Sequence, residues 1–193
     1  MRRISLATAL LFTVAACGSP DTDDQSDGAA PTAPGGATTM APEAGTMTQA
    51  RAALQTAEGK SAGTATAMEQ AGSVRVSLQV QGMPQGTHGV HVHMTGRCEG
   101  PAFESAGSHW NPTNAQHGLE GTPGQHAGDM PNLQIGADGR GTLEYTLQNA
   151  TFAGLLDSDG SAFIVHAKTD DQQTDPSGNS GDRIACGVFE QAG

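Results

Sequence analysis

Hydrophobic and polar residues alternate along several short stretches from about residue 51 onwards. In the range 73–80, valine or leucine occupies every second position, from Val74 to Val80. A period of two predicts a strand with one buried face. The same alternation returns at 143–147, after a turn at 137–139. These patterns favour an all-β domain over a helical bundle.

Turn residues between these stretches delimit further strands. The dipeptides at 58–59 and 71–72, Glu-Gly and Ala-Gly, are typical of hairpin connections. They predict an antiparallel meander, and more strands are expected later in the chain; the ranges are 52–56, 61–69, 73–80, 87–94, 162–167 and 184–190. Many short strands at this spacing favour a β-sandwich or barrel.

Two long segments, 95–131 and 169–182, show no regular pattern. Long irregular loops in a compact domain are usually either functional or disordered. These two contain or flank most of the histidines and both cysteines of the domain. We therefore expect the two loops to carry the function.

The first 16 residues resemble a secretory leader. Arg2 and Arg3 precede an apolar run, 6–14, that is too short to span a bilayer. The next residues, Val-Ala-Ala-Cys at 14–17, resemble the lipobox of bacterial lipoproteins, in which the cysteine is acylated. Cys17 is thus the predicted lipid anchor to a membrane of the bacterial cell envelope, on its periplasmic or outer cell-surface side. The alternative is an ordinary signal peptide that leaves Cys17 as a free thiol.

The range 17–50 has almost no large apolar residue, and from residue 18 onwards it carries five acidic residues and no basic one. Such a segment cannot bury enough surface to offset the entropy of ordering it. It predicts an extended tether; a binding motif within it is the alternative. The predicted organisation is a leader at 1–16, a tether at 17–50 and one domain at 51–193.

The chain is acidic, with 9 basic against 20 acidic residues and a net charge of −11. This charge argues against nucleic acid or an anionic membrane surface as a partner. Aromatic residues make up only 4% of the chain, which also contains 27 glycines. The core is therefore expected to be aliphatic and its frame rich in turns.

All seven histidines lie between His88 and His166. His91 and His93 are two apart on an expected strand, so both rings face one side, as chelation requires. His88 has odd spacing from His91 and is expected to be a hydrogen-bonded structural residue. Further candidate ligands follow at His109, His117, His126, Asp129 and His166. Six histidines and one aspartate exceed one tetrahedral site and imply two metal ions.

In this order the residues resemble the copper/zinc superoxide dismutase family. The resemblance covers most of 51–193 and rests on the phrases at 88–93, 105–112, 126–133 and 181–188. It implies an all-β, eight-stranded antiparallel Greek-key β-sandwich or barrel with two long active-site loops. The implied activity converts superoxide to dioxygen and hydrogen peroxide by alternate reduction and oxidation of copper, which would protect the cell envelope from superoxide.

The resemblance also assigns ligands to each metal. The copper ligands would be His91, His93, His109 and His166, and the zinc ligands His109, His117, His126 and Asp129. His109 would bridge the two metals and act with Arg183 in catalysis. Imidazole-rich coordination suits redox copper, whereas four protein ligands leave zinc no open position and a structural role.

Two charged residues beyond the ligands have roles implied by the resemblance. Asp170 would link His91 to His117 and fix their tautomers; the alternative is a solvated loop aspartate. Arg183 would bind the anionic substrate beside copper. Its alternative is a surface ion pair with Asp182.

The cysteines follow by elimination. With Cys17 assigned to lipid, Cys98 and Cys186 remain to form a disulfide, which an exported domain permits. It would tie the loop around Cys98 to the last strand.

Two other functions compete with the dismutase. One is a copper/zinc-binding or chaperone lipoprotein without turnover; family members of that kind usually lose a copper ligand or the arginine, and this sequence keeps both. The other is a zinc hydrolase, which is disfavoured because no carboxylate base accompanies an open three-histidine site. The expected partners are superoxide and, through the lipid on Cys17, a membrane. The sequence leaves open whether the domain is a monomer or a homodimer.

Overall fold

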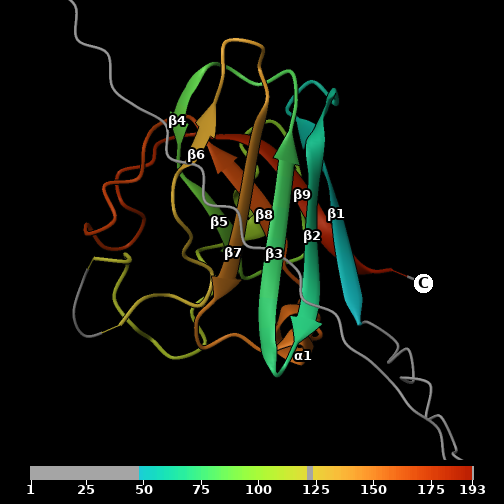
Figure 1. Ribbon diagram of the computed structural model, residues 1–193, viewed down its shortest axis with the longest axis vertical. Coiled ribbons are helices and arrows are strands. Elements are labelled where there is room, and N and C mark those ends of the chain that lie inside the picture. The colour runs from blue at the N-terminus through green and yellow to red at the C-terminus, as the bar shows by residue number, and fades with distance from the viewer. Residues whose placement is uncertain (1–47, 121–123, 193) are drawn as a thin grey trace, which may run out of the picture. The chain divides into compact units, whose positions relative to one another are not determined.

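Nine strands lie in residues 48–120 and 124–192, which are the residues that the computed structural model describes. Seven form one antiparallel sheet in the order β5-β8-β9-β1-β2-β3-β7, and β4 pairs with β6 in a small second sheet (Figure 1). The bounds are β1 Gln49–Thr56, β2 Ser61–Gln70, β3 Ser73–Val80, β4 Gly86–His88, β5 Val90–His93, β6 Leu133–Ile135, β7 Gly141–Leu147, β8 Ala162–His166 and β9 Arg183–Gln191.

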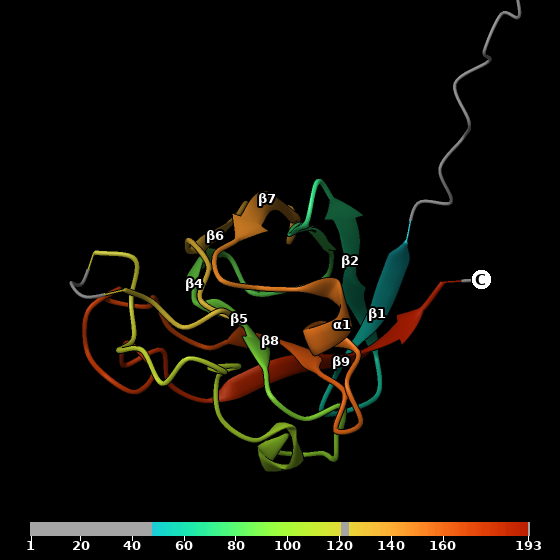
Figure 2. The same ribbon diagram turned by 90° about the horizontal axis from the view of Figure 1, so that it is seen from below.

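The long sheet is curled, and the small sheet lies between its two end strands, β5 and β7 (Figure 2). Strands distant in sequence are neighbours in space, such as β1 with β9 and β3 with β7. The predicted all-β sandwich or barrel class is confirmed. A single turn of helix, α1 (Phe152–Leu155), and a 3-10 turn, η1 (Glu104–Ala106), were not predicted.

The sequence pattern predicted seven strand ranges, and the structure has two more strands. The short strand β6 was not predicted, and the stretch 87–94 divides at Gly89. There the chain leaves the small sheet as β4 and joins the long sheet as β5. The N–H of Gly89 donates to the carbonyl of Lys168, and a Cβ at this position would lie 2.9 Å from the Cβ of Ser180. The loop after β8 therefore packs directly on the chain at Gly89, where a side chain would prevent the contact.

The interior follows the predicted alternation. Val74, Val76 and Leu78 of β3 are fully buried, and Ala65 and Ala67 lie opposite the last two on β2. Burial of such aliphatic surface is the main favourable contribution to folding. The aliphatic core expected from composition is thus present.

Strand β8 departs from this alternation because all five of its residues are buried. Phe163 and Val165 face the main core, whereas Ile164 packs in a second cluster with Phe103 and Ala106. The loop after β5 therefore covers the outer face of β8. This cover places the loop beside the ends of β5, β8 and β9, where the histidines gather.

The predicted leader and residues 17–47 of the predicted tether lie outside the described residues, so those predictions stay as they are. The tether was predicted two residues too long, because β1 begins at Gln49 and Ala50 is buried in the core. Among the described residues, no helix has both the length and the apolar character needed to cross a membrane.

Candidate metal centre

The metal centre is built along β5. On one edge β5 pairs with β8; on the other it pairs with two pieces of the long loop. The N–H of Trp110 donates to the carbonyl of Val92, and the N–H of Val92 donates to the carbonyl of Gly128, both at 2.9 Å. A Cβ on Gly128 would lie only 2.2 Å from the Val92 oxygen, so this approach requires glycine. These contacts bring the loop residues His109 and Asp129 opposite the strand histidines.

Four buried histidines form what we call the open cluster, each offering one ring nitrogen within 4.8 Å of the others: His91, His93, His109 and His166. The rings of His91 and His109 stack with centroids 3.8 Å apart. Each of the four residues is at most 5% exposed. Burial lowers the pKa of His91 to about 3 and that of His166 to about 4, which keeps both rings neutral and able to bind a metal.

In each ring of the open cluster the other nitrogen is already engaged. His91 Nε2 donates to Asp170 at 2.5 Å, and His93 Nδ1 and His166 Nδ1 donate to the carbonyls of Gly107 and Gly181. The remaining nitrogens have no hydrogen-bond partner among the described residues: His91 Nδ1, His93 Nε2, His109 Nε2 and His166 Nε2. Buried polar atoms are rarely left unpaired. Four neutral ring nitrogens that lie close to one another fit a metal ion that takes imidazole ligands, such as copper.

A second set, the closed cluster, shares His109 and comprises His109, His117, His126 and Asp129. Its three Nδ1 atoms lie 3.0, 3.0 and 3.3 Å from a single oxygen, Oδ1 of Asp129. The other oxygen of Asp129 accepts from the backbone N–H groups of Gly118 and His126. Three nitrogens and one carboxylate oxygen are a tetrahedral donor set typical of zinc.

The ionised carboxylate of Asp129 agrees with that donor set, whereas His117 has to release a proton before it can bind a metal. Burial opposes ionisation of Asp129, but the three imidazoles around the carboxyl outweigh it and hold the pKa of this group far below its usual range. Burial likewise disfavours charge on His117, but Asp129 and Asp170 raise its pKa to about 9. A divalent cation would meet an ionised carboxylate here.

Asp170 joins the two clusters. It is 2% exposed, and its carboxylate contacts Nε2 of His91 and, at 3.1 Å, Nε2 of His117. It is therefore not the solvated loop side chain of the alternative. The side chain of Asn132 holds the backbone of Asp170 in place. The Asn132 Nδ2 amide donates to the Asp170 carbonyl, and Asn132 Oδ1 accepts from the Asp170 N–H, both at 2.8 Å. Sequence reasoning missed Asn132, although it lies within the phrase 126–133.

Arg183 lies at the start of β9, beside the open cluster. Its guanidinium donates to the carbonyls of Phe103 and Gly107 at 2.6 and 2.7 Å, and the Gly107 oxygen also accepts from His93. One carbonyl thus separates Arg183 from a metal-facing histidine. In the described part of the chain Arg183 forms no salt bridge with Asp182, so the surface ion pair of the alternative is not formed.

The predicted disulfide is confirmed: Cys98 and Cys186 are bonded, with Cα atoms 5.7 Å apart. The bridge lies in the second apolar cluster with Phe103, whose carbonyl holds Arg183. It therefore fixes the loop that positions the guanidinium. Cys17 lies outside the described residues.

The seventh histidine is separate from both clusters. His88 is buried, with Nδ1 2.8 Å from the carbonyl oxygen of His166 and Nε2 3.1 Å from that of Pro84. Its contacts are those of the structural residue that its odd spacing predicted.

The sequence of this chain is similar to those of known proteins with a named family. A family model described as copper/zinc superoxide dismutase matches residues 61–189. The superoxide dismutase-like protein YojM of Bacillus subtilis is 46% identical over 111 residues, which are 55% of this chain and 57% of that protein. This chain thus spans little more than half the length of YojM.

Other relatives are matched over more of their length. The Cu-Zn superoxide dismutase of Caulobacter vibrioides is 38% identical over 148 residues, 73% of this chain and 85% of the relative. Among solved structures, a SOD-like protein from Bacillus subtilis superposes with a TM-score of 0.65 at 39% identity, covering 72% of this chain and 96% of that one.

Proposed function

Since the chain belongs to the copper/zinc superoxide dismutase family, we propose that it is itself a superoxide dismutase. Two superoxide anions and two protons would give one dioxygen and one hydrogen peroxide. The observation that carries the proposal is the open cluster, where four buried imidazole nitrogens face one another without a hydrogen-bond partner among the described residues. Copper bound there would supply the redox chemistry, taking one electron from a first superoxide and giving it to a second.

Within this proposal His109 is a proton carrier. Its Nδ1 contacts Asp129 in the closed cluster, while its Nε2 faces the open cluster. The closed cluster can therefore hold the ring in place while Nε2 takes up and releases a proton. Zinc in the closed cluster would be structural, because four protein ligands leave no position for substrate.

Arg183 is the proposed substrate-binding residue. Two carbonyls fix its guanidinium, and the Gly107 carbonyl ties it to His93. A fixed cation next to the open cluster favours a small anion and offers no basic group that would compete with it. This local attraction has to act against the net charge of −11 of the whole chain.

The test is a superoxide-removal assay on full-length protein loaded with copper and zinc, with metal content measured on the same sample. We expect cyanide-sensitive activity, its loss in His91→Ala, and a fall of at least tenfold in Arg183→Ala at unchanged copper content. Arg140→Ala is the matched control. Arg140 is exposed, lies between β6 and β7 and is not part of either cluster, so this variant should keep full activity.

The competing function is a copper/zinc-binding protein without turnover. It is kept as a candidate because the relative YojM is named only dismutase-like. Full copper loading with no superoxide removal would decide for this function and against the enzyme.

We also propose that lipid on Cys17 holds the domain at a membrane of the cell envelope, where it would remove superoxide. The support is the lipobox-like sequence at 14–17. Labelled palmitate should enter the wild-type protein and be absent from Cys17→Ala. Equal labelling of both proteins would refute the anchor.

A further inference from the structure

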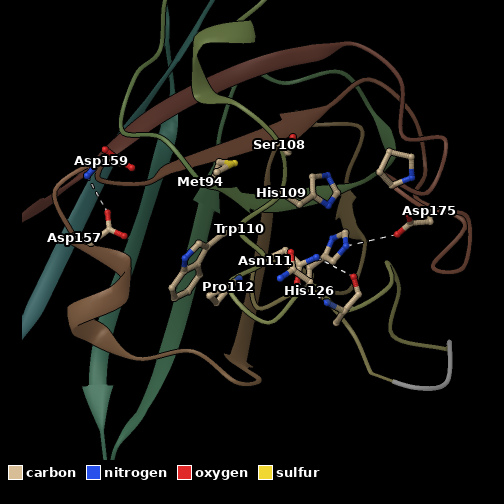
Figure 3. Close-up of a pocket in the computed structure, with 13 residues that line it drawn as sticks. Met94, Ser108, His109, Trp110, Asn111, Pro112, His126, Asp157, Asp159 and Asp175 are labelled. Carbon is tan, nitrogen blue, oxygen red and sulfur yellow. Dashed lines mark hydrogen bonds and ion pairs between the residues drawn. The ribbon is translucent and has the colours of Figure 1, made fainter.

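A pocket of 420 Å³ opens beside the closed cluster, and His109 and His126 form part of its wall (Figure 3). Asp157 and Asp159, in the turn before β8, line its opposite end. A water molecule occupies about 30 Å³ of liquid, so the pocket has room for a hydrated ion. It therefore joins the surface to two residues of the closed cluster.

The inner end of the pocket reaches a histidine whose Nδ1 faces the closed cluster. His126 is 4% exposed, and its Nδ1 is buried without a hydrogen-bond partner in the described ranges. This nitrogen is one of the three that face Asp129. The ring of His126 thus lines the pocket and also carries a nitrogen, Nδ1, that is available to bind a metal in the closed cluster.

The charge of the pocket has one sign. Its lining includes Asp157, Asp159 and Asp175 and no lysine or arginine. Asp157 is held in place, because its Oδ1 accepts from the backbone N–H groups of Asp159 and Gly160. Carboxylates lining one concave surface attract cations and raise their local concentration.

From these observations we propose that this pocket is the port through which zinc reaches the closed cluster, with Asp157 and Asp159 attracting the hydrated ion. The inference rests on the proposed function, since it needs zinc as the resident metal of that cluster. The two carboxylates act on the passage of the ion and are not ligands of the bound ion.

The test measures zinc transfer in both directions on the full-length chain. Release to an excess of chelator starts from the zinc-loaded protein, and uptake starts from the same protein after zinc extraction, with circular dichroism checking that it stays folded. The chain has a single tryptophan, Trp110, and it lines the pocket, so its fluorescence provides a second signal from the pocket itself.

In the double variant Asp157→Asn/Asp159→Asn we expect uptake and release to slow together by about fivefold at low salt, with the dissociation constant unchanged. The matched control is Asp138→Asn/Glu190→Gln, which removes the same charge from exposed positions outside the pocket. Its rates should stay within about twofold of wild type, because distant exposed charges are screened. Asp175 is left unchanged, because its carboxylate accepts from the N–H of the ligand His117.

A second variant narrows the port without changing charge. Ala115 lines the pocket, and the Asn111 side chain bonds both its N–H and its carbonyl, so a larger side chain can be placed there on a fixed backbone. Ala115→Phe should slow uptake and release equally.

Equal slowing in the charge variant and its control would overturn the port. So would unchanged rates in the charge variant, or a change in only one of the two rates, which would alter the dissociation constant. Failure of the wild-type protein to bind one zinc would overturn both this inference and the zinc site of the proposed function. Normal zinc binding with no dismutase activity would remove the enzyme and leave the port standing.

Discussion

The open and closed clusters share His109 but differ in what carries their other members. His91, His93 and His166 belong to β5 and β8, whose backbones are hydrogen-bonded to each other. The other members of the closed cluster, His117, His126 and Asp129, belong to a loop. Hydrogen bonds from His117 and from the backbone of Gly118 and His126 to the Asp129 carboxylate hold this loop together. The sheet therefore places three of the four ligands of the open cluster before a metal binds. In the closed cluster, the positions of the ligands depend on the Asp129 carboxylate and, we expect, on the bound metal.

The largest effect on stability should come from removing the disulfide, which supports the open cluster and the strands that carry it. Cys98→Ala/Cys186→Ala should lower the free energy of unfolding by about 4 kcal/mol at most, since the bridge closes a separation of 88 residues. Activity should also fall, because the loop holding Arg183 loosens. Urea unfolding and the assay measure both, and zinc content should not change. Loss of zinc in this variant would contradict the view that the open and closed clusters are supported independently.

Asp129→Ala should act on the loop side, at a cost of about 3 kcal/mol in unfolding free energy, because buried imidazoles lose their common partner. Zinc should no longer bind, while copper binding survives through the strand histidines. Metal content after dialysis measures this, with Asp138→Ala as the exposed control. Equal loss of both metals would show that the clusters are a single unit.

Asp170→Asn tests the link between the two clusters. Because the carboxylate contacts His91 and His117, the variant should weaken both copper and zinc binding by about 10- to 100-fold. Asp171→Asn is the neighbouring control: that carboxylate is exposed and accepts from the N–H groups of Gln173 and Thr174. Competition with chelators measures the affinities. A change confined to one metal would place Asp170 in that cluster alone.

Zinc removal should speed amide exchange about tenfold at Gly118, whose N–H donates to Asp129, and leave Val165 of β8 within about twofold. Hydrogen–deuterium exchange followed by mass spectrometry of peptides covering each segment would show the difference. Equal acceleration in both segments would mean that the sheet does not place its ligands independently.

The smallest expected effect is that of salt on turnover. Arg183 is the proposed anion-binding residue, but the chain carries a net charge of −11, and Asp182 immediately precedes Arg183 and lines the same pocket. The rate should therefore change less than about threefold between low and physiological ionic strength. A steep fall would reveal a stronger positive field at the open cluster than these residues suggest.

Strand positions were predictable wherever one face is buried and the other is not. The alternation at 73–80 became β3 within its predicted bounds. The stretch 87–94 was predicted as a single strand because the sequence pattern carries no information on sheet membership; the change at Gly89 depends on the loop residues Ser180 and Asp170 packing against it. Helix α1 was missed because four residues are too few for a helical period to be recognised.

The sequence alone supplied the donors: six histidines and an aspartate of suitable chemistry, in an order that resembles one family, with two cysteines left to pair. Their residue types and spacing were enough, since ligand chemistry belongs to the side chain. The tertiary structure decided which nitrogen of each ring stays free. That choice depends on groups remote in sequence, such as the carbonyls of Gly107 and Gly181 and the Asp170 carboxylate held by Asn132. A hydrogen bond to one ring nitrogen fixes the tautomer and leaves the other for metal, and only the folded chain brings these partners within reach.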